Sequence, residues 1–204
     1  LLQKLYDKGL LYKGYTIQPY SPAAGTGLSS HELNMPGAYK EVKDTTVVAL
    51  FKVIKNDQSS FLFDDPNEDV RIAAWTTTPW TLPSNTALCA GPDVSYIKIK
   101  TSNPYTHTPV SVVLAEALVP NWFGGKNQST VEGQSAAFKG SKMKGIRYEP
   151  LLDFGNEIEP LLGGTDAYLV LTGDHVTTSD GTGIVHTAPS FGADDQRVAK
   201  ANGV

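Results

Sequence analysis

The segment GTGIVHTAPSFGADD, residues 181–195, gathers several reactive side chains within a short stretch of the chain. A glycine turn leads into an apolar run that ends at His186, and Asp194 and Asp195 follow a proline-broken loop. A carboxylate can bind a cationic group, and an imidazole can act as a general base or shape a pocket. Taken alone, the two acids are also typical of the first turn of a helix, where the helix dipole favours them.

The segment WTTTPWTLPSN, residues 75–85, supplies hydroxyl groups. Pro79 disfavours helical backbone at Thr78, so we expect the run to stay extended into a bend. Side chains alternate along an extended chain, which predicts Thr76 and Thr78 on one face and Thr77 on the other. Three threonines are by themselves ordinary strand residues, but their hydroxyls can also position water and stabilise a developing oxyanion.

The elements that must position these side chains are mostly strands. Apolar and β-branched runs predict a strand at 45–54 and a returning strand at 70–78, joined across an acidic turn at 64–69. Further strands are expected at 94–101, 110–115, 167–173 and 182–188, and helices at 1–10, 116–124 and 193–203. This pattern predicts a β-rich α+β fold with a partly closed, barrel-like sheet and a few peripheral helices.

The composition limits the classes of function. The 204 residues carry a net charge of −4, so a strongly basic surface for nucleic acid is not indicated. One cysteine excludes an internal disulfide, and four scattered histidines show no metal-ligand spacing, so no metal is expected. No apolar run approaches the roughly 18 residues of a membrane span. The sequence begins without Met, and we expect it to be part of a longer polypeptide.

Residues 75–85 and 181–195 together resemble the two signature segments of the editing domain inserted in isoleucyl-tRNA synthetases, which are class I aminoacyl-tRNA synthetases. The flanking segments at 9–32 and 39–53 are also similar to those of this family. The resemblance therefore covers nearly the whole chain, and its two long motifs are highly specific.

The resemblance implies a single editing domain over residues 1–204, with 1–20 and 193–204 near its junctions with the catalytic domain. The motifs of the synthetic active site are absent, so ATP and magnesium belong to that catalytic domain and no cofactor is expected here. The implied partners are the 3′ CCA end of isoleucine tRNA carrying valine and the rest of the synthetase chain. A cytoplasmic monomer without a membrane partner is expected.

The implied function compensates for the limited ability of a binding pocket to distinguish valine from isoleucine. One methylene in an apolar pocket is worth only about 1–3 kcal/mol, and isoleucyl-tRNA synthetases are themselves the standard example of this limit. The implied remedy is a second site that deacylates mischarged Val-tRNA by direct attack of a positioned water on the ester. The resemblance implies that Asp195 binds the α-ammonium group of the substrate. It implies that His186 forms a wall of the pocket that excludes isoleucine. It assigns positioning of the water to Thr76, Thr77 and Thr78, while the spacing does not reveal which group activates the water.

The resemblance also implies further contacts with the substrate, and these residues are Trp75, Thr81 and Asn85. Asp194 is expected to be a solvent-facing or capping neighbour. A local basic stretch is a candidate tRNA phosphate contact, although a solvated loop explains the same residues, which are Lys139, Lys142, Lys144 and Arg147.

Two other functions remain open at this point. One is a valyl- or leucyl-type editing domain on the same fold, but those domains generally carry Arg, Pro and an acid after two threonines. Here the residues are Thr78, Pro79 and Trp80, and His186 has no counterpart in those domains, so the isoleucyl type is favoured. The other is a non-catalytic tRNA-binding insertion, which the intact threonines, His186 and Asp195 disfavour.

Overall fold

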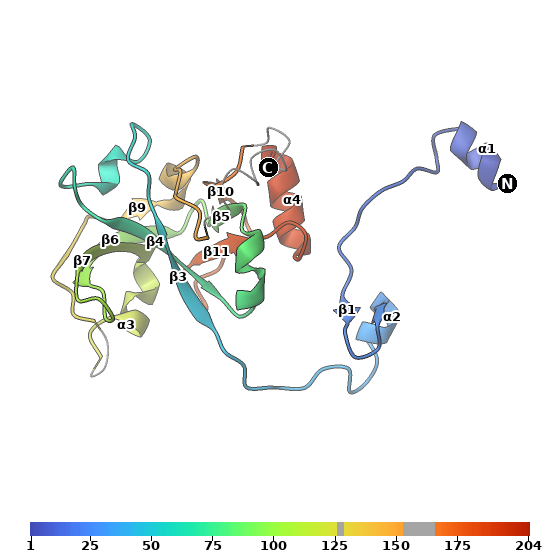
Figure 1. Ribbon diagram of the computed structural model, residues 1–204, viewed down its shortest axis with the longest axis horizontal. Helices are drawn as coiled ribbons and strands as arrows, with labels where there is room; N and C mark the ends of the chain where they lie inside the picture. The colour runs from blue at the N-terminus through green and yellow to red at the C-terminus, as the bar shows by residue number, and fades with distance from the viewer. Residues whose placement is uncertain (126–128, 153–165) are drawn as a thin grey trace. The chain divides into compact units, whose positions relative to one another are not determined.

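The computed structural model describes residues 1–125, 129–152 and 166–204 (Figure 1). They form two compact units, 1–43 and 44–204, each of which is described by itself. The extent of the single domain expected from the sequence stays a prediction.

The first unit is small and has no buried residue. It contains α1 (Leu2–Asp7), β1 (Tyr20–Ser21), β2 (Thr26–Gly27) and α2 (Ser30–Leu33). The helix expected at 1–10 is confirmed in its first part, and Gly9 follows it in the left-handed conformation at φ +67°. Ser29 and Glu32 form a reciprocal capping box at the start of α2, in which the Glu32 carboxylate accepts the Ser29 N–H at 2.7 Å.

The second unit is built on a nine-stranded mixed sheet. Seven strands follow one another in the order β10-β5-β11-β4-β7-β6-β8, while β3 pairs with β4 and β9 pairs with β6. The strand bounds are β3 (Val47–Lys52), β4 (Val70–Thr76), β5 (Ala87–Ala90), β6 (Ser95–Ser102), β7 (Pro109–Ala115), β8 (Gly133–Gln134), β9 (Phe138–Lys139), β10 (Leu169–Thr172) and β11 (Ile184–Thr187).

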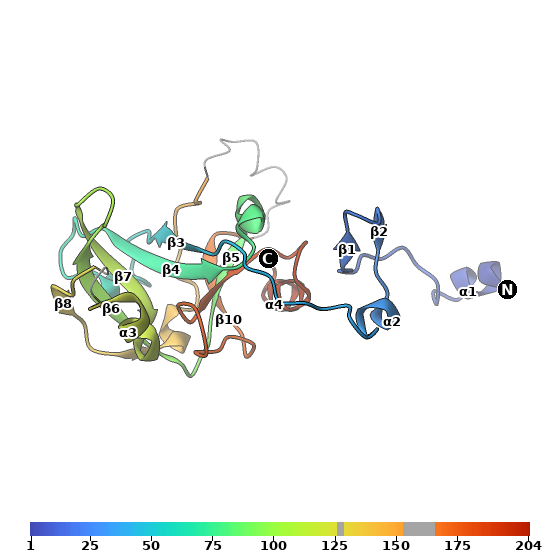
Figure 2. The same ribbon diagram turned by 90° about the horizontal axis from the view of Figure 1, so that it is seen from below.

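Short helices decorate this sheet. The 3-10 turns are η1 (Ser60–Leu62), η2 (Pro79–Ser84), η3 (Glu116–Leu118) and η4 (Gly140–Met143), and the α-helices are α3 (Val119–Trp122) and α4 (Ala193–Asn202). α3 packs on β6 and β7 through Val119 and Trp122 (Figure 2). α4 lies beside β10 and β5, and its Val198 packs against Cys89 and Leu171 (Figure 1). Among the described residues, no helix has the length and apolarity needed to cross a membrane.

All six strands expected in this unit are confirmed within a few residues, as is the sheet-dominated α+β class with few helices. The hairpin across the acidic turn is also confirmed, because β3 pairs antiparallel with β4. The strand β5, which lies between β10 and β11, was missed, since its sequence ALCA is short, lacks β-branched residues and is buried on both faces. Partial closure of the sheet into a barrel stays a prediction.

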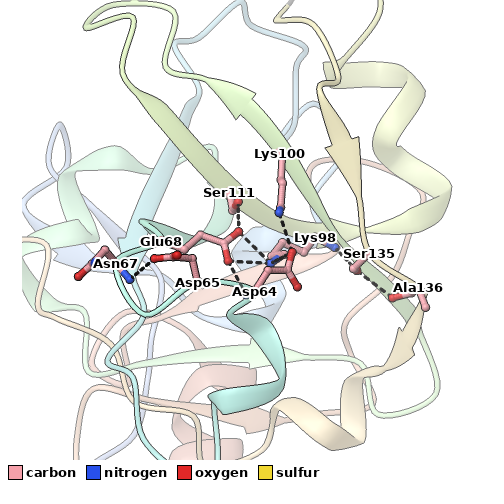
Figure 3. Close-up of polar contacts among 9 residues, drawn as sticks. All are labelled: Asp64, Asp65, Asn67, Glu68, Lys98, Lys100, Ser111, Ser135 and Ala136. Atoms are coloured by element: carbon pink, nitrogen blue, oxygen red, sulfur yellow. Dashed lines mark hydrogen bonds and ion pairs between the residues drawn. The ribbon is translucent and has the colours of Figure 1, made fainter.

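The acidic turn covers a buried cation at one end of the sheet (Figure 3). Lys98 on β6 is 2% exposed, and its ammonium group lies 3.0 Å from the Asp64 carboxylate and 2.8 Å from that of Glu68. Burial raises the pKa of Glu68, but hydrogen bonds from Lys98 and Ser111 outweigh this effect and the net pKa is lowered. The turn expected at 64–69 therefore closes over the sheet as an ion-pair cluster, because a buried ammonium requires nearby carboxylates.

Candidate functional site

The two motifs meet because β4 and β11 run parallel. Val185 is the register partner of Trp75, which places Thr76 and His186 at the same edge of the sheet, where both strands end. β5 pairs antiparallel with the other side of β11, with Leu88 opposite His186. Residues that lie far apart in the sequence thus share one sheet edge, and the loop after β11 leads directly into α4.

A cavity of about 410 Å³ opens at this edge. It contains seven of the residues predicted from the sequence, which are Trp75, Thr76, Thr77, Thr78, Thr81, His186 and Asp195. Four more residues complete its wall, and these are Trp80, Val185, Phe191 and Gly192. Trp80 and Phe191 are largely exposed and were not predicted as site residues, although both lie inside the two motifs.

The threonine hydroxyls divide into a bonded pair and an exposed one. Thr76 and Thr78 place their Oγ1 atoms 3.2 Å apart, and Thr76 Oγ1 also accepts the Thr78 N–H at 3.0 Å. Thr77 is exposed and lines the same cavity as Thr76 and Thr78, although alternation placed it on the other face, because β4 ends at Thr76 and Thr77 lies in the bend that follows. The bend forms where Pro79 begins η2, which turns Thr81 back so that its N–H and hydroxyl both donate to the Thr78 carbonyl.

His186 is buried and hydrogen-bonded through both ring nitrogens. Its Nε2 lies 2.8 Å from Thr81 Oγ1, and its Nδ1 lies 3.1 Å from the amide nitrogen of Asn85. Burial lowers the pKa of His186, and the charge of Asp195 opposes this only in part. The ring is therefore neutral near pH 7, and a ring whose two nitrogens are both engaged is better suited to forming a wall than to taking a proton from water.

Asp195 lies in the first turn of α4 and is held by the preceding loop. Its Oδ2 accepts the Ala188 N–H at 3.0 Å, which fixes the carboxylate at the cavity. Gly192 makes this position possible, since a Cβ at that residue would lie 2.8 Å from Asp195 Oδ2. Asp194 points elsewhere: it is exposed and pairs with Arg197 at 3.0 Å, as expected for the solvent-facing neighbour.

Five predicted residues do not line the cavity. Asn85 lies behind His186, where its amide also donates to the Ala87 carbonyl at 2.8 Å, so a direct contact with substrate stays a prediction. The other four are the basic residues Lys139, Lys142, Lys144 and Arg147. Lys139 donates to the Asp93 carbonyl, and Arg147 pairs with Asp166, so both cations already have partners within the domain.

The cavity combines an anchored carboxylate, a neutral imidazole and a set of hydroxyl groups. The carboxylate can bind an ammonium group, and hydroxyls can orient water or an oxyanion. Within the described ranges, no group of three or more His, Cys, Asp or Glu side chains is arranged to hold a metal ion.

The sequence relatives reported below are all isoleucine–tRNA ligases. The chain is 52% identical over 217 residues to the isoleucine–tRNA ligase of Porphyromonas gingivalis, and 50% identical over 221 residues to that of Bacteroides thetaiotaomicron. It is 41% identical over 216 residues to the isoleucine–tRNA ligase of Treponema denticola. Each match covers the whole of this chain and 18–19% of the relative, so the chain spans less than a fifth of the relatives' length. The chain is homologous to the isoleucine–tRNA ligases.

Solved structures add the fold of this homologue. The crystal structure of GlLeuRS-CP1 matches 76% of the chain and 59% of that structure with a TM-score of 0.58 at 19% identity. The crystal structure of the P. knowlesi cytosolic leucyl-tRNA synthetase editing domain matches 76% of the chain and 62% of that structure, with a TM-score of 0.53 at 13% identity. The isoleucine–tRNA ligase homologue therefore has the fold of a synthetase editing domain. No family model matches the chain.

Proposed function

We propose that this domain, as part of an isoleucyl-tRNA synthetase, deacylates isoleucine tRNA that has been wrongly charged with valine. The hydrolysis takes place after the amino acid has been transferred to the tRNA. The observation that carries the proposal is the joining of Asp195, His186 and the three threonines in one cavity. A non-catalytic binding insertion would not need an anchored carboxylate beside the exposed hydroxyl of Thr77.

Asp195 provides the anchor for the substrate. An aminoacyl ester presents a protonated α-amino group, and the carboxylate is held at the cavity by the Ala188 N–H. A charge-assisted hydrogen bond of this kind contributes about 1.5–3 kcal/mol when water is excluded. The anchored amine then fixes the direction in which the amino-acid side chain points.

His186 limits the size of that side chain. The imidazole is 5% exposed and is held from both nitrogens, so it cannot move aside at low cost to admit a larger group. In the proposed role the ring leaves room for valine and excludes the extra methylene of isoleucine. A general-base role is disfavoured because neither nitrogen is free to receive the proton.

The hydrolytic step uses water and the hydroxyl groups. A water oxygen attacks the ester carbonyl carbon, the bond from that carbon to the ribose oxygen breaks, and a proton from the water ends on the ribose hydroxyl. Thr77 is exposed at the cavity, and its hydroxyl is the one placed to orient the water or the oxyanion. The proposal requires no cofactor, so deacylation should persist in the presence of EDTA.

The proposed macromolecular partners are the CCA end of isoleucine tRNA and the rest of the synthetase chain, in the cytoplasm. The net charge of −4 fits a domain that grips only a single-stranded end. Contacts from Lys142 and Lys144 to tRNA phosphates are the remaining part of this proposal, since both side chains are exposed.

The proposal is tested by comparing deacylation of Val-tRNA and Ile-tRNA by the full polypeptide and by its His186→Ala variant. The wild type should hydrolyse Val-tRNA and spare Ile-tRNA. The variant should keep hydrolysis of Val-tRNA and gain on Ile-tRNA by about tenfold or more, the worth of one methylene. Equal loss on both substrates would instead indicate that His186 acts in the chemistry, and no deacylation by the wild type would reject the proposed function.

A further inference from the structure

The hydrogen bonds of His186 continue into the hydrophobic core. Asn85, whose amide nitrogen faces His186, accepts through its Oδ1 a hydrogen bond from the Tyr148 hydroxyl at 2.7 Å. Tyr148 is 1% exposed, and its ring packs edge-on against Phe51 with centroids 5.1 Å apart. A core residue that does not line the cavity is therefore connected to His186 through one amide.

The donors and acceptors in this series of hydrogen bonds are fixed on the Asn85 side of His186. The Ala87 carbonyl can only accept, so the Asn85 group 2.8 Å from it must be the NH₂ group. The Asn85 oxygen then faces Tyr148, and burial keeps the pKa of that phenol well above its usual range, so it remains a donor. The second N–H of Asn85 points at His186 Nδ1, which must accept and therefore carries no proton.

The hydrogen bonds on the Thr81 side of His186 independently indicate the same tautomer. The Thr78 carbonyl can only accept, so the Thr81 hydroxyl donates its proton there at 2.8 Å. The Thr81 oxygen is left to accept from His186 Nε2, also at 2.8 Å. Both ends therefore require a neutral ring with its proton on Nε2, which also matches the lowered pKa of His186.

From this geometry we infer that Tyr148 is a positioning residue of the editing site, which sets the tautomer and orientation of His186 through Asn85 and so sharpens the exclusion of isoleucine. The inference rests on the proposed function for its consequence in editing, but not for the tautomer itself. Tyr148 does not line the cavity, and its aromatic packing against Phe51 holds its hydroxyl in place.

Without the phenol, the Asn85 amide loses one of the two hydrogen bonds that fix its direction, and only its bond to the Ala87 carbonyl still opposes rotation. Rotation of the amide would let its oxygen face Nδ1 and accept a proton from it, which favours the other tautomer and the imidazolium. Asp195 is the charged group that acts on His186 and favours the same cationic form, while its other polar neighbours Thr81 and Asn85 are uncharged. The ring should therefore become easier to protonate and less fixed in position.

Two measurements on the full polypeptide test the inference with Tyr148→Phe, which keeps the packed ring and removes only the hydroxyl. NMR of the ¹⁵N-histidine-labelled protein, with His186 assigned by loss of its signals in His186→Gln, should show the Nε2-protonated tautomer in the wild type. The variant should show a mixture of tautomers and an upward shift of the His186 titration. The ratio of kcat/KM on Ile-tRNA to that on Val-tRNA should rise by about three- to tenfold, the worth of one hydrogen bond.

Tyr96→Phe is the matched control. Tyr96 is also fully buried, and its hydroxyl donates to Gly183 at 2.6 Å and accepts from Gly91 at 2.9 Å, away from His186. This variant should lose stability but keep the His186 tautomer and the substrate ratio. If Tyr148→Phe does not fold, Asn85→Asp replaces the donating amide by an acceptor and should move the tautomer in the same direction.

The outcomes separate the two claims. A wild-type ring protonated on Nδ1, or an unchanged tautomer in Tyr148→Phe, overturns the inference whatever the activity. A changed tautomer with an unchanged substrate ratio overturns its editing consequence. Failure of the wild type to deacylate Val-tRNA rejects the proposed function alone, because the NMR result still decides the role of Tyr148.

Discussion

At the scale of single residues, the site is defined by which polar groups are already bonded and which are left for a ligand. His186 has both nitrogens occupied, whereas Asp195 uses one oxygen on a backbone N–H and faces the cavity with the rest of its carboxylate. A bonded ring is a poor acid or base and a carboxylate open to the cavity can bind a cation, so this hydrogen-bond pattern supports the proposed roles of His186 and Asp195.

The pair Asp194 and Asp195 offers a matched test at this scale. Asp195→Asn removes the charge that binds the ammonium group, and loss of a charge-assisted hydrogen bond should lower kcat/KM for Val-tRNA deacylation by about 10- to 100-fold. Asp194→Asn, one residue away and paired with Arg197 at the surface, should change it less than about twofold, as exposed ion pairs contribute little. Equal losses from both variants would count against the anchor.

At the scale of elements, the carboxylate depends on how α4 leaves the sheet. The turn after β11 brings the start of α4 back against Ala188, and Gly192 leaves space for the Asp195 side chain beside that turn. α4 ends as a regular helix should, with Gly203 in the left-handed conformation at φ +75°. Gly192 thus leaves space for the Asp195 carboxylate, and Gly203 ends the helix α4.

These two glycines predict different consequences for the same substitution. Gly192→Ala places a Cβ 2.8 Å from Asp195 Oδ2 at an ordinary backbone φ of −131°, so the carboxylate must move while the helix persists. Kinetics should show weaker deacylation of Val-tRNA with little change in the thermal unfolding curve. Gly203→Ala should do the reverse, with a loss of about 1 kcal/mol in unfolding free energy and normal deacylation. Normal activity in Gly192→Ala would show that the carboxylate position is not critical.

At the scale of the second unit, the cavity and the buried ion-pair cluster are located in different parts of the sheet. The cavity lies where β4 and β11 end, whereas the buried Lys98 lies on β6, which is separated from β4 by β7. Lys98, Asp64 and Glu68 tie the acidic turn to the sheet (Figure 3). Separate positions of this kind allow the ion-pair cluster to be changed without touching the residues that line the cavity.

Lys98→Met tests this separation. Removal of the ammonium leaves the largely buried Glu68 carboxylate without its partner, and breaking a buried pair costs about 3–5 kcal/mol of unfolding free energy. Urea unfolding should show this loss, while protein that remains folded should deacylate Val-tRNA normally. Lys100→Met is the control, because Lys100 is exposed on the same strand and pairs with Asp64, so its effect on unfolding should be small.

The same pair sets a pH dependence. The pKa of Glu68 is lowered in the folded protein from its ordinary value of 4.5, so its contribution to stability is complete above that value and is lost as pH falls through the folded pKa. Without Lys98 its hydrogen bond and charge no longer lower this pKa, while the bonds from Ser111 and the Asp64 N–H remain, so this part of the acid dependence should become smaller in Lys98→Met. A parallel decline in both proteins would show that the pair does not govern acid stability.

Much of this protein is determined locally by its sequence. The β-branched runs at 47–52 and 70–76 predict their strands, and the acids and Gly203 predict the bounds of α4, because each depends on neighbours within a few residues. The two motifs likewise identify seven residues of the cavity wall. β5 was not predicted because a short Ala- and Cys-rich run carries no periodic signal. Only its burial between β10 and β11 makes it a strand.

The tertiary structure alone decided how these residues work together. Parallel pairing of β4 with β11 brings His186 beside Thr76, and the choice of partner for a strand depends on the whole sheet. The protonation of His186 is set by Asn85 and, through it, by Tyr148, which lies 63 residues from Asn85 in the chain. The proton position on an imidazole is fixed by the donors and acceptors around it, and only the folded chain brings those groups together.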